Sequence, residues 1–406
     1  MLNKYRSWFY VLSVLFSSTS SSMYIIALSW ILYETSGNAF YSGLMVGIGF
    51  IPGLLLNLFS GVIIDRLNQK LITVLCLSIN SLVILFLTLF ISTNSLAVWT
   101  IITFHVMLQL MSSIIKPAMQ ALIVQIFSKK EYTKVIGISA SLGELGWIFG
   151  VSATGFLLIF LEEVYVFLII LIISLLSLLS LSFVKSINNN SMQLEQEKNS
   201  VLFDLKDGYN YLLKNKTILG LFGIGFVGQL VLHSNTGLLS VYTKSHLDKP
   251  SHIFGLLEAV LSSGAIIAGL VTSWVFLKTK SLLPTISIFI IILGISFLSF
   301  SKVIIFSFLG IFFLGFGTTL LRVITQSIQQ IITDSLYHGR MASYRMIINQ
   351  GSVVIGSPVL GLISETYGAN YAYMVLLIPT FFSLVYSIVF LKQKSTQNVI
   401  SSVLTR

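Results

Sequence analysis

The sequence predicts an all-α polytopic membrane protein with twelve transmembrane helices in two pseudo-symmetric six-helix halves. Three observations predict this fold class. The residues are 55% hydrophobic and only 9% charged, whereas a soluble domain carries about a quarter charged residues. The apolar residues come in blocks of roughly 20 or more, the length that a helix needs to cross a hydrocarbon core. The second half of the chain also repeats polar and glycine positions of the first.

Each apolar block is a candidate span, and short polar connections separate the blocks. The predicted spans are residues 8–33, 39–64, 71–92, 97–120, 135–160, 163–184, 217–243, 252–277, 281–300, 303–328, 341–365 and 369–391. The first block follows Lys4 and Arg6 as a secretory signal would, but it is too long and no small-residue cleavage site follows it. The single cysteine, Cys76, lies inside the third block, so no disulfide framework is expected.

Basic residues predict the orientation of the spans, because lysine and arginine resist translocation. With the N-terminus inside, most of them fall in cytoplasmic connections, and the opposite side receives only Lys244, Lys249 and Lys302. Both termini are therefore expected in the cytoplasm, in a multi-pass protein of the cell (inner, cytoplasmic) membrane. The net charge of +10 follows from this placement, so nucleic acid is not an expected partner.

The longest polar stretch divides the chain. The predicted divisions are an N-terminal half (1–184), a cytoplasmic linker (185–216), a C-terminal half (217–391) and a cytoplasmic tail (392–406). Within the linker, Leu202, Leu205, Tyr209 and Leu212 recur at helical spacing. This pattern predicts a helix over about residues 201–213 that lies on the membrane surface.

An internal repeat relates the two halves through a shift of 206 residues, which carries position 116 to position 322. The aligned pairs are Lys116 with Arg322, Gln120 with Gln326, Lys134 with Arg340, Glu144 with Gln350, Gly150 with Gly356 and Gly155 with Gly361. Several secondary transporters consist of repeated halves and bind their substrate between them near the bilayer midplane. A central cavity between the halves is therefore expected.

The connection between the second and third spans carries a family motif. It reads Gly61-Val-Ile-Ile-Asp65-Arg66-Leu-Asn68-Gln69-Lys70 and resembles the pattern G-x-x-x-D-R-x-G-R-R/K of the major facilitator superfamily. The matching residues are Gly61, Asp65, Arg66 and Lys70, and the departures are Asn68 and Gln69. The resemblance implies the major facilitator fold and a gating contact that a conformational change must break. The residues alone also fit a solvated turn whose charges only fix the topology.

Two further motifs look like the macrolide-efflux and siderophore-exporter branch of that superfamily. They are Lys116-Pro117-Ala118 followed by Ala121-Leu122-Ile123, and His338-Gly339-Arg340-Met341-Ala342-Ser343 before the eleventh span. This resemblance implies export of small amphipathic molecules, either drug-like or macrolide-like compounds or a metallophore. No cofactor is expected, and the proton gradient is the expected source of energy.

Polar residues inside the spans are candidates for proton coupling or substrate binding, because they are costly in a bilayer unless they face a cavity or a partner. Glu144 in the fifth span is the first candidate, and Glu258, nearer the external face, is the second. The other candidates are Gln120, Gln326, Asn349, Gln350, His105 and His233. Additional polar residues of the spans are Asn57, Gln109, Gln229 and Asn235. Each could instead be a structural hydrogen-bond partner between helices.

Basic residues near the cytoplasmic ends of spans are candidates for gating or for binding acidic groups. They are Lys116, Arg322 and Arg340, and the alternative is that their long side chains extend to the interface. The small-residue pairs Gly146-x-x-x-Gly150 and Ser357-x-x-x-Gly361 predict close packing between the halves. The Ser/Thr run over residues 17–22 predicts a similar close contact or part of a cavity lining.

Other classes of function find little support in the sequence. It lacks the G-x-x-x-x-G-K-[ST] motif, so transport powered by ATP within this chain is not expected. Catalytic residues and metal ligands are not predicted, and neither is enzymatic activity. The predicted function is a proton-coupled exporter that works as a monomer by alternating access, with a small-molecule substrate and the lipid bilayer as partners. Uptake or lipid translocation on the same fold is the alternative, followed by a membrane-embedded receptor or enzyme.

Overall fold

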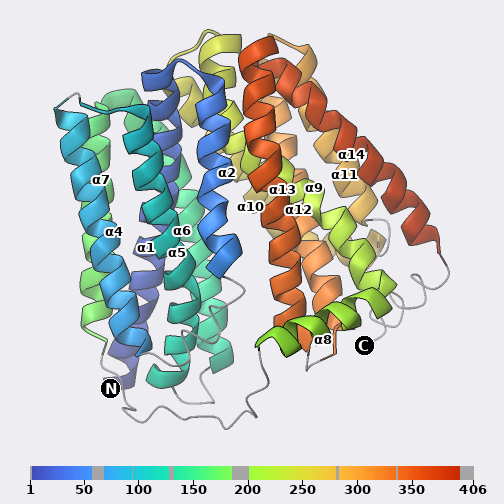
Figure 1. Ribbon diagram of the computed structural model, residues 1–406, viewed down its shortest axis with the longest axis horizontal. Coiled ribbons are helices and arrows are strands. Elements are labelled where there is room, and N and C mark those ends of the chain that lie inside the picture. Colours follow the sequence, from blue (N-terminus) through green and yellow to red (C-terminus); the bar gives the residue numbers. More distant parts are fainter. Residues whose placement is uncertain are drawn as a thin grey trace. The chain divides into compact units, whose positions relative to one another are not determined.

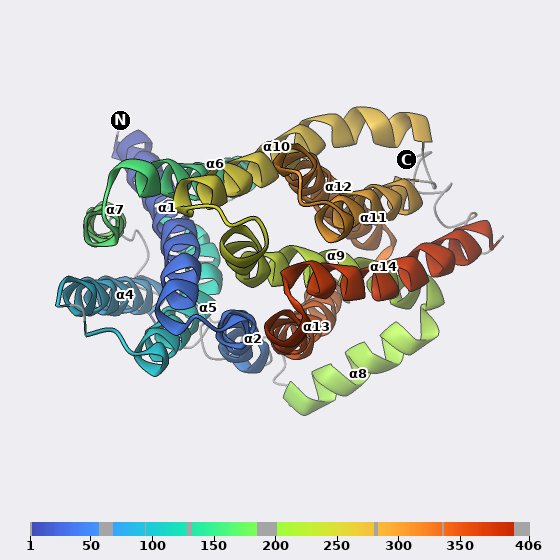
Figure 2. The ribbon, with the colours of Figure 1, turned by 90° about the horizontal axis from the view of Figure 1, so that it is seen from above.

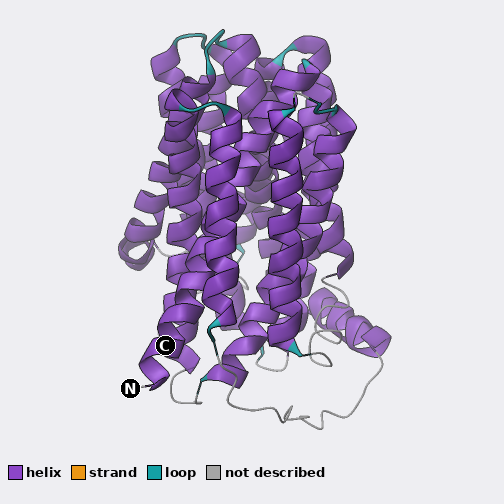
Figure 3. Ribbon diagram, turned by 90° about the vertical axis from the view of Figure 1, so that its left-hand side faces the viewer, coloured by secondary structure: helices purple, strands orange, loops and turns teal. Residues whose placement is uncertain are grey.

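The computed structural model describes residues 2–56, 68–93, 95–127, 132–184, 201–279, 283–334 and 337–393. Within these ranges, helices are the only regular secondary structure (Figure 3). Twelve of them are long and apolar enough to cross a membrane. The predicted fold class and the predicted number of spans are therefore confirmed.

The chain forms two compact units, which are residues 1–37 with 55–198 and residues 38–54 with 199–406. The first unit contains α1 (Leu2–Ser36), α4 (Gln69–Ser92), α5 (Val98–Ile126), α6 (Tyr132–Phe160) and α7 (Glu163–Ser182). The second unit contains most of α2 (Ala39–Leu56), α8 (Val201–Lys214), α9 (Lys216–Val241), η1 (Tyr242–His246), α10 (Ser251–Thr279), α11 (Leu283–Phe300), α12 (Ile304–Ile332), α13 (His338–Tyr367) and α14 (Ala369–Lys392). Figure 1 labels the α-helices.

The helix boundaries follow the internal repeat. Helices α5 and α12 begin at residues 98 and 304, α6 and α13 at 132 and 338, and α7 and α14 at 163 and 369. Each of these pairs is separated by 206 residues, the same shift that aligns the polar residues. The repeat detected in the sequence therefore extends to three pairs of helices.

In the first unit, α1 packs along α6 and α7, and α4 packs along α5 and α7 (Figure 2). Two glycines of α6 make the contact with α1 close. A Cβ atom at Gly146 would lie 2.6 Å from the carbonyl oxygen of Leu15, and one at Gly150 would lie 2.5 Å from that of Thr19. The Gly146/Gly150 pair therefore meets the Ser/Thr run of α1 inside one unit, and its predicted role in packing between the halves is wrong.

In the second unit, α12 packs against α10, α11 and α9, and α13 packs against α9 and α14. The residues of α2 that belong to this unit contact α13. The backbone N–H of Ala39, at the start of α2, donates a 2.7 Å hydrogen bond to the Glu365 carboxylate, and a carboxylate at a helix N-terminus is favourable. A Cβ atom at Gly43 would lie 2.8 Å from Cα of Gly361. These contacts explain why residues 38–54 group with the second unit.

The linker helix α8 confirms the helix predicted over about residues 201–213. Figure 1 shows it lying across the ends of α9 and α13. Leu212 is buried in a cluster with Ile218, Phe222 and Met341. The apolar side of α8 is thus covered in part by other helices of the second unit.

Polar contacts hold α8 on the same unit. The hydroxyl of Tyr337 donates a 3.0 Å hydrogen bond to the Asp207 carboxylate, and the rings of Tyr337 and Tyr211 stack with centroids 4.0 Å apart. The hydrogen bond to Asp207 raises the pKa of Tyr337, because the bond favours the neutral phenol. The Tyr211 hydroxyl accepts a 3.1 Å hydrogen bond from the backbone N–H of Asp334.

Candidate functional site

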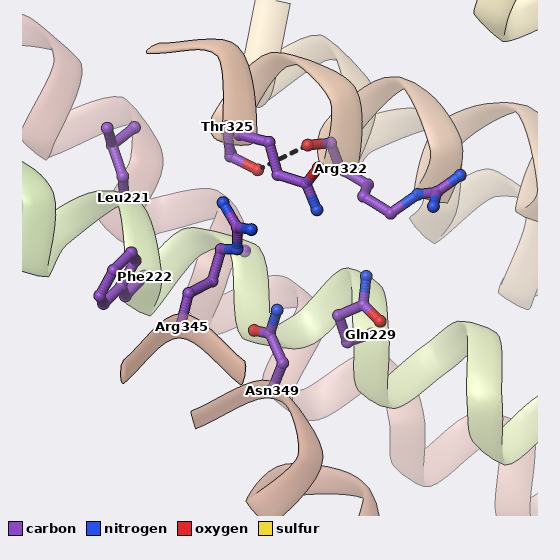
Figure 4. A pocket seen from close by; sticks show the side chains of 9 residues that line it. Leu221, Phe222, Gln229, Arg322, Thr325, Arg345 and Asn349 are labelled. Carbon is purple, nitrogen blue, oxygen red and sulfur yellow. Dashed lines mark hydrogen bonds between the residues drawn. The ribbon is translucent and has the colours of Figure 1, made fainter. Parts of the chain in front are cut away.

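A small polar cavity lies inside the second unit, between α9, α12 and α13 (Figure 4). Nine residues line it: Leu221, Phe222, Gly225, Gln229, Arg322, Thr325, Gln326, Arg345 and Asn349. The centre of a water-sized sphere can move through about 10 Å³ of this cavity. That space suffices for about one water molecule or one small polar group.

Helical periodicity brings these side chains together. Residues three and four positions apart lie on the same face of a helix. Arg322, Thr325 and Gln326 have this spacing on α12, and Arg345 and Asn349 have it on α13. Contacts of α9 with both α12 and α13 bring the faces to one place.

Two guanidinium groups dominate the charge of the cavity, and no Asp or Glu is found among its lining residues. Arg345 donates a hydrogen bond to the neutral amide oxygen of Gln329. Oδ1 of Asn349 is buried and has no hydrogen-bond partner. The hydroxyl of Thr325 bonds back to the carbonyl oxygens of Leu321 at 2.7 Å and Arg322 at 3.2 Å. The cavity is therefore rich in positive charge and in hydrogen-bonding groups.

The structure unites candidates that the sequence placed in separate groups. Arg322 was predicted as a gating residue, whereas Gln326 and Asn349 were predicted as substrate or coupling residues, and all three line the cavity. Gln229, one of the additional polar residues, joins them. Arg345 was missed, although a charged residue within the eleventh predicted span is a signal that could have identified it. Gln350 is partly buried on α13 and does not line the cavity.

Glu258 lies in a second polar cluster of the same unit. Its side chain is 2% exposed, and its Oε1 atom is buried without a hydrogen-bond partner. Tyr373 of α14 lies near Glu258 and donates a 2.7 Å hydrogen bond to Oδ1 of Asn235 on α9. The Tyr373 ring packs edge-on against Tyr242, at a centroid distance of 5.4 Å. An acidic group thus lies among tyrosine and amide side chains in the interior of this unit.

The two intramembrane histidines lie in different surroundings. His105 on α5 is buried beside Tyr24, whose hydroxyl donates a 2.8 Å hydrogen bond to Gln109. His233 on α9 is 3.1 Å from the amide oxygen of Gln229 and packs against the ring of Phe50. His233 therefore connects to the cavity through Gln229, whereas His105 belongs to the first unit.

The remaining candidates of the first unit are exposed. Glu144 lies on α6 between the packed glycines Gly143 and Gly146, and Lys116 and Gln120 lie on α5 on either side of Pro117. Their side chains are all more accessible than that of Glu258. The two candidate acids therefore differ in exposure, because Glu258 is buried and Glu144 is exposed.

The loop motif lies partly outside the described residues, because Gly61, Asp65, Arg66 and the polar residue Asn57 fall in the range 57–67. The last residues of the motif, 68–70, lie in the described part of the chain. Asn68 accepts a 3.1 Å hydrogen bond from the backbone N–H of Leu71 and caps α4, with a φ of −71° that requires no glycine. Lys70 donates a 3.4 Å hydrogen bond to the carbonyl oxygen of Ser182, at the end of α7, where a positive charge is favourable.

Arg340, the other predicted gating residue, forms an ion pair with Asp207 of α8. Its side chain also lies over the ring of Tyr337, with Cζ 5.2 Å from the ring centroid. Among the residues whose placement is described, no group of three or more His, Cys, Asp or Glu side chains could hold a metal ion.

Twelve apolar spans and polar clusters buried inside them define a polytopic membrane protein. The chain belongs to the Major Facilitator Superfamily, whose sequence profile matches residues 10–342. This is a family of transporters and not of enzymes. No curated protein matches the sequence significantly.

Solved structures with the same fold include transporters. The nucleoside transporter NupG is 15% identical, with a TM-score of 0.73 over 96% of this chain and 100% of that chain. A bacterial homolog of the human lysosomal transporter Spinster, in an inward-facing and occupied conformation, is 13% identical, with a TM-score of 0.73 over 96% of each chain. At these identities the likeness concerns the fold alone.

Proposed function

We propose that this protein is a secondary active transporter that exports small amphipathic molecules across the cytoplasmic membrane in exchange for protons. Its two six-helix halves would expose a central substrate site alternately to each side of the membrane. Family membership and the efflux-like motifs at Lys116-Pro117-Ala118 and at residues 338–343 support this proposal. Drug-like or macrolide-like compounds and metallophores are the candidate substrates, and the protein acts as a monomer with both termini in the cytoplasm.

Burial of Glu258 is the observation that carries the proton coupling. An ionised carboxylate is costly in an apolar interior unless it is paired and hydrogen-bonded. Oε1 of Glu258 has no such partner, so binding a proton is the simplest way to reduce this cost. A conformational change that admits water to Glu258 would favour release of the proton. Glu144, which is exposed on α6, is the alternative acid.

Flux into inside-out membrane vesicles tests the proposal. Respiration acidifies the vesicle lumen, and the membrane-impermeant amphipathic anion sulforhodamine B, whose fluorescence does not depend on pH, reports accumulation. We expect the dye to accumulate only in vesicles that contain the protein, and a protonophore to abolish the accumulation. Glu258→Gln should reduce the accumulation to the level seen with protonophore, whereas Glu162→Gln, which neutralises an exposed acid before α7, should have no effect.

Other outcomes would change the proposal in defined ways. Accumulation that resists the protonophore would remove proton coupling. Loss of accumulation in Glu144→Gln but not in Glu258→Gln would transfer the coupling role to Glu144. Accumulation only in right-side-out vesicles would favour uptake, the second candidate, which is consistent with the nucleoside transporter among the structures that share this fold. Lipid translocation on this fold would instead appear as movement of a labelled phospholipid.

A further inference from the structure

The cavity of the second unit combines two positive charges with a space for one small group. Arg322 and Arg345 both line it, and the lining described above contains no acidic side chain. Positive charge away from bulk water is weakly screened. An anionic group that enters the cavity would therefore be attracted to it.

The known contacts of Arg345 leave its charge unbalanced. Its partner is the neutral side chain of Gln329, which satisfies a hydrogen-bond donor but does not neutralise the guanidinium. Arginine has five N–H donors in a planar fork that matches carboxylate, sulfonate and phosphate oxygens. Arg345 can therefore keep Gln329 and still bind an anion through other N–H groups.

Snorkelling does not account for Arg322. It lies ten residues before Ile332, the nearer end of α12, and each residue of a helix adds about 1.5 Å along the axis. Arg322 lines the cavity together with Gln326, Gln229 and Asn349. A basic residue at such a depth is typically associated with a substrate pathway or an intramembrane partner.

The amide groups complete a site for one anionic group. The Gln229 and Gln326 side chains carry N–H donors, and Oδ1 of Asn349 is a buried acceptor without a partner. A half-turn of the Asn349 amide would present its N–H₂ group in place of this oxygen and add a third amide donor. The available space, about 10 Å³ for the centre of a water-sized sphere, is too small for a whole amphipathic molecule but suits a single charged end group.

We infer that this cavity anchors the anionic group of the transported molecule, so that the substrate is an amphipathic organic anion bearing a carboxylate, sulfonate or phosphate. The inference rests on the proposed transport function and adds a substrate class to it. A negative membrane potential inside the cell would assist the export of such an anion.

Ligand-dependent thermal stability of the purified full-length protein in detergent tests this inference without measuring flux. The probes are sodium benzoate, its uncharged counterpart benzyl alcohol, and sodium phosphate, all at one ionic strength. Benzoate should raise the apparent melting temperature saturably, and neither of the other two probes should match it. Arg345→Gln and Arg322→Gln should each weaken the apparent affinity for benzoate about tenfold or more, because each removes a charge-assisted hydrogen bond.

Two further variants control the measurement. Lys216→Gln removes a positive charge from the exposed start of α9, a helix that also lines the cavity, and it should leave the benzoate response unchanged. Arg345→Lys keeps the charge but loses the planar fork, and we expect it to bind benzoate more weakly than the wild type. If Arg345→Gln does not fold, Arg345→Lys and Arg322→Gln carry the test.

Four results would overturn the inference. The first is a benzoate response that is the same in the arginine variants and the wild type, and the second is a response to benzyl alcohol that equals the response to benzoate. The third is an arginine-dependent response to phosphate as strong as that to benzoate.

The fourth result concerns a lipid headgroup as the source of the anion. If nanodiscs with phosphatidylglycerol abolish the benzoate response seen in phosphatidylcholine nanodiscs, the cavity binds lipid and not substrate. The thermal assay measures binding and not flux. A negative result in it would overturn the anionic substrate class without contradicting transport measured in vesicles, and a negative vesicle result would not change the measured affinity for benzoate.

Discussion

Asp207 of the linker helix α8 forms an ion pair with Arg340 in the first turn of α13. The same carboxylate accepts the hydrogen bond of Tyr337, so two residues at the start of α13 hold one residue of the linker. Arg340 aligns with Lys134 in the internal repeat. In the second half, Arg340 at this repeat position therefore connects α8 to the start of α13.

The first prediction concerns this attachment. Asp207→Asn should weaken the docking of α8, because it removes the ion pair and weakens the acceptor of the Tyr337 hydroxyl. A partly exposed ion pair contributes about 0.2–1 kcal/mol, so the expected effect is local opening and not loss of the fold. Hydrogen exchange of the backbone amides of residues 201–214 should become several-fold faster.

Lys214→Gln is the matched control, since it removes a charge from an exposed position at the end of the same helix. It should leave the exchange of α8 unchanged. Equal exchange rates in Asp207→Asn and the wild type would show that apolar contacts of residues such as Leu212 hold the helix without the ion pair.

The second prediction concerns the close contact of α6 with α1. Gly150→Ala should lower the stability of the protein, because its Cβ atom would lie 2.5 Å from the carbonyl oxygen of Thr19. Overpacking of this kind costs about 1–3 kcal/mol. Gly143→Ala, on the same helix, would place its Cβ atom at an ordinary 3.5 Å from Ser18 and Val14. The apparent melting temperature in detergent should fall for the first variant only; an equal change in both would contradict the packing seen here.

The third prediction concerns the hydrogen bond of Tyr373 with Asn235 beside Glu258. Tyr373→Phe should destabilise the protein by about 1–3 kcal/mol, because it leaves the buried oxygen of Asn235 without its donor. Tyr386→Phe removes a hydroxyl from a residue of the same helix that is 44% exposed, and it should have little effect. The comparison of apparent melting temperatures checks this. No difference between the two variants would show that the 2.7 Å bond contributes no net stability.

The fourth prediction concerns Cys76, the only cysteine of the chain. Its side chain is buried in the core of the first unit, beside residues such as Leu77 and Leu122. N-ethylmaleimide should therefore modify the folded protein slowly and the protein in sodium dodecyl sulfate rapidly, as intact mass measurements can show. Rapid modification of the folded protein would mean that this core opens readily.

The fifth prediction concerns the orientation, which follows from the placement of the basic residues. A fluorescent protein fused after Arg406 should fluoresce in cells, and alkaline phosphatase fused at the same point should be inactive. A fusion of the phosphatase within the connection at residues 301–303, between α11 and α12, should be active because that connection is expected outside. The opposite pattern would reverse the orientation.

Several features of this protein follow from local sequence alone. The number of spans, the approximate ends that lie in the described part of the chain, and the helix of the linker were predicted correctly, because the thickness of a bilayer requires long apolar segments and every backbone polar group in lipid must be paired within a helix. The repeat of 206 residues was also visible, since rare polar residues such as Gln120 and Gln326 carry it. These properties depend on neighbouring residues or on simple alignment.

Only the tertiary structure decided which side chains meet. It places Arg345 and Arg322 in the lining of one cavity, and it buries Glu258 but leaves Glu144 exposed. It also directs the glycines of α6 toward α1 within one unit. Hydropathy determines that a helix crosses the membrane, but the rotation of the helix about its axis depends on packing against helices distant in the sequence. Contacts between such segments therefore determine the polar sites of this transporter.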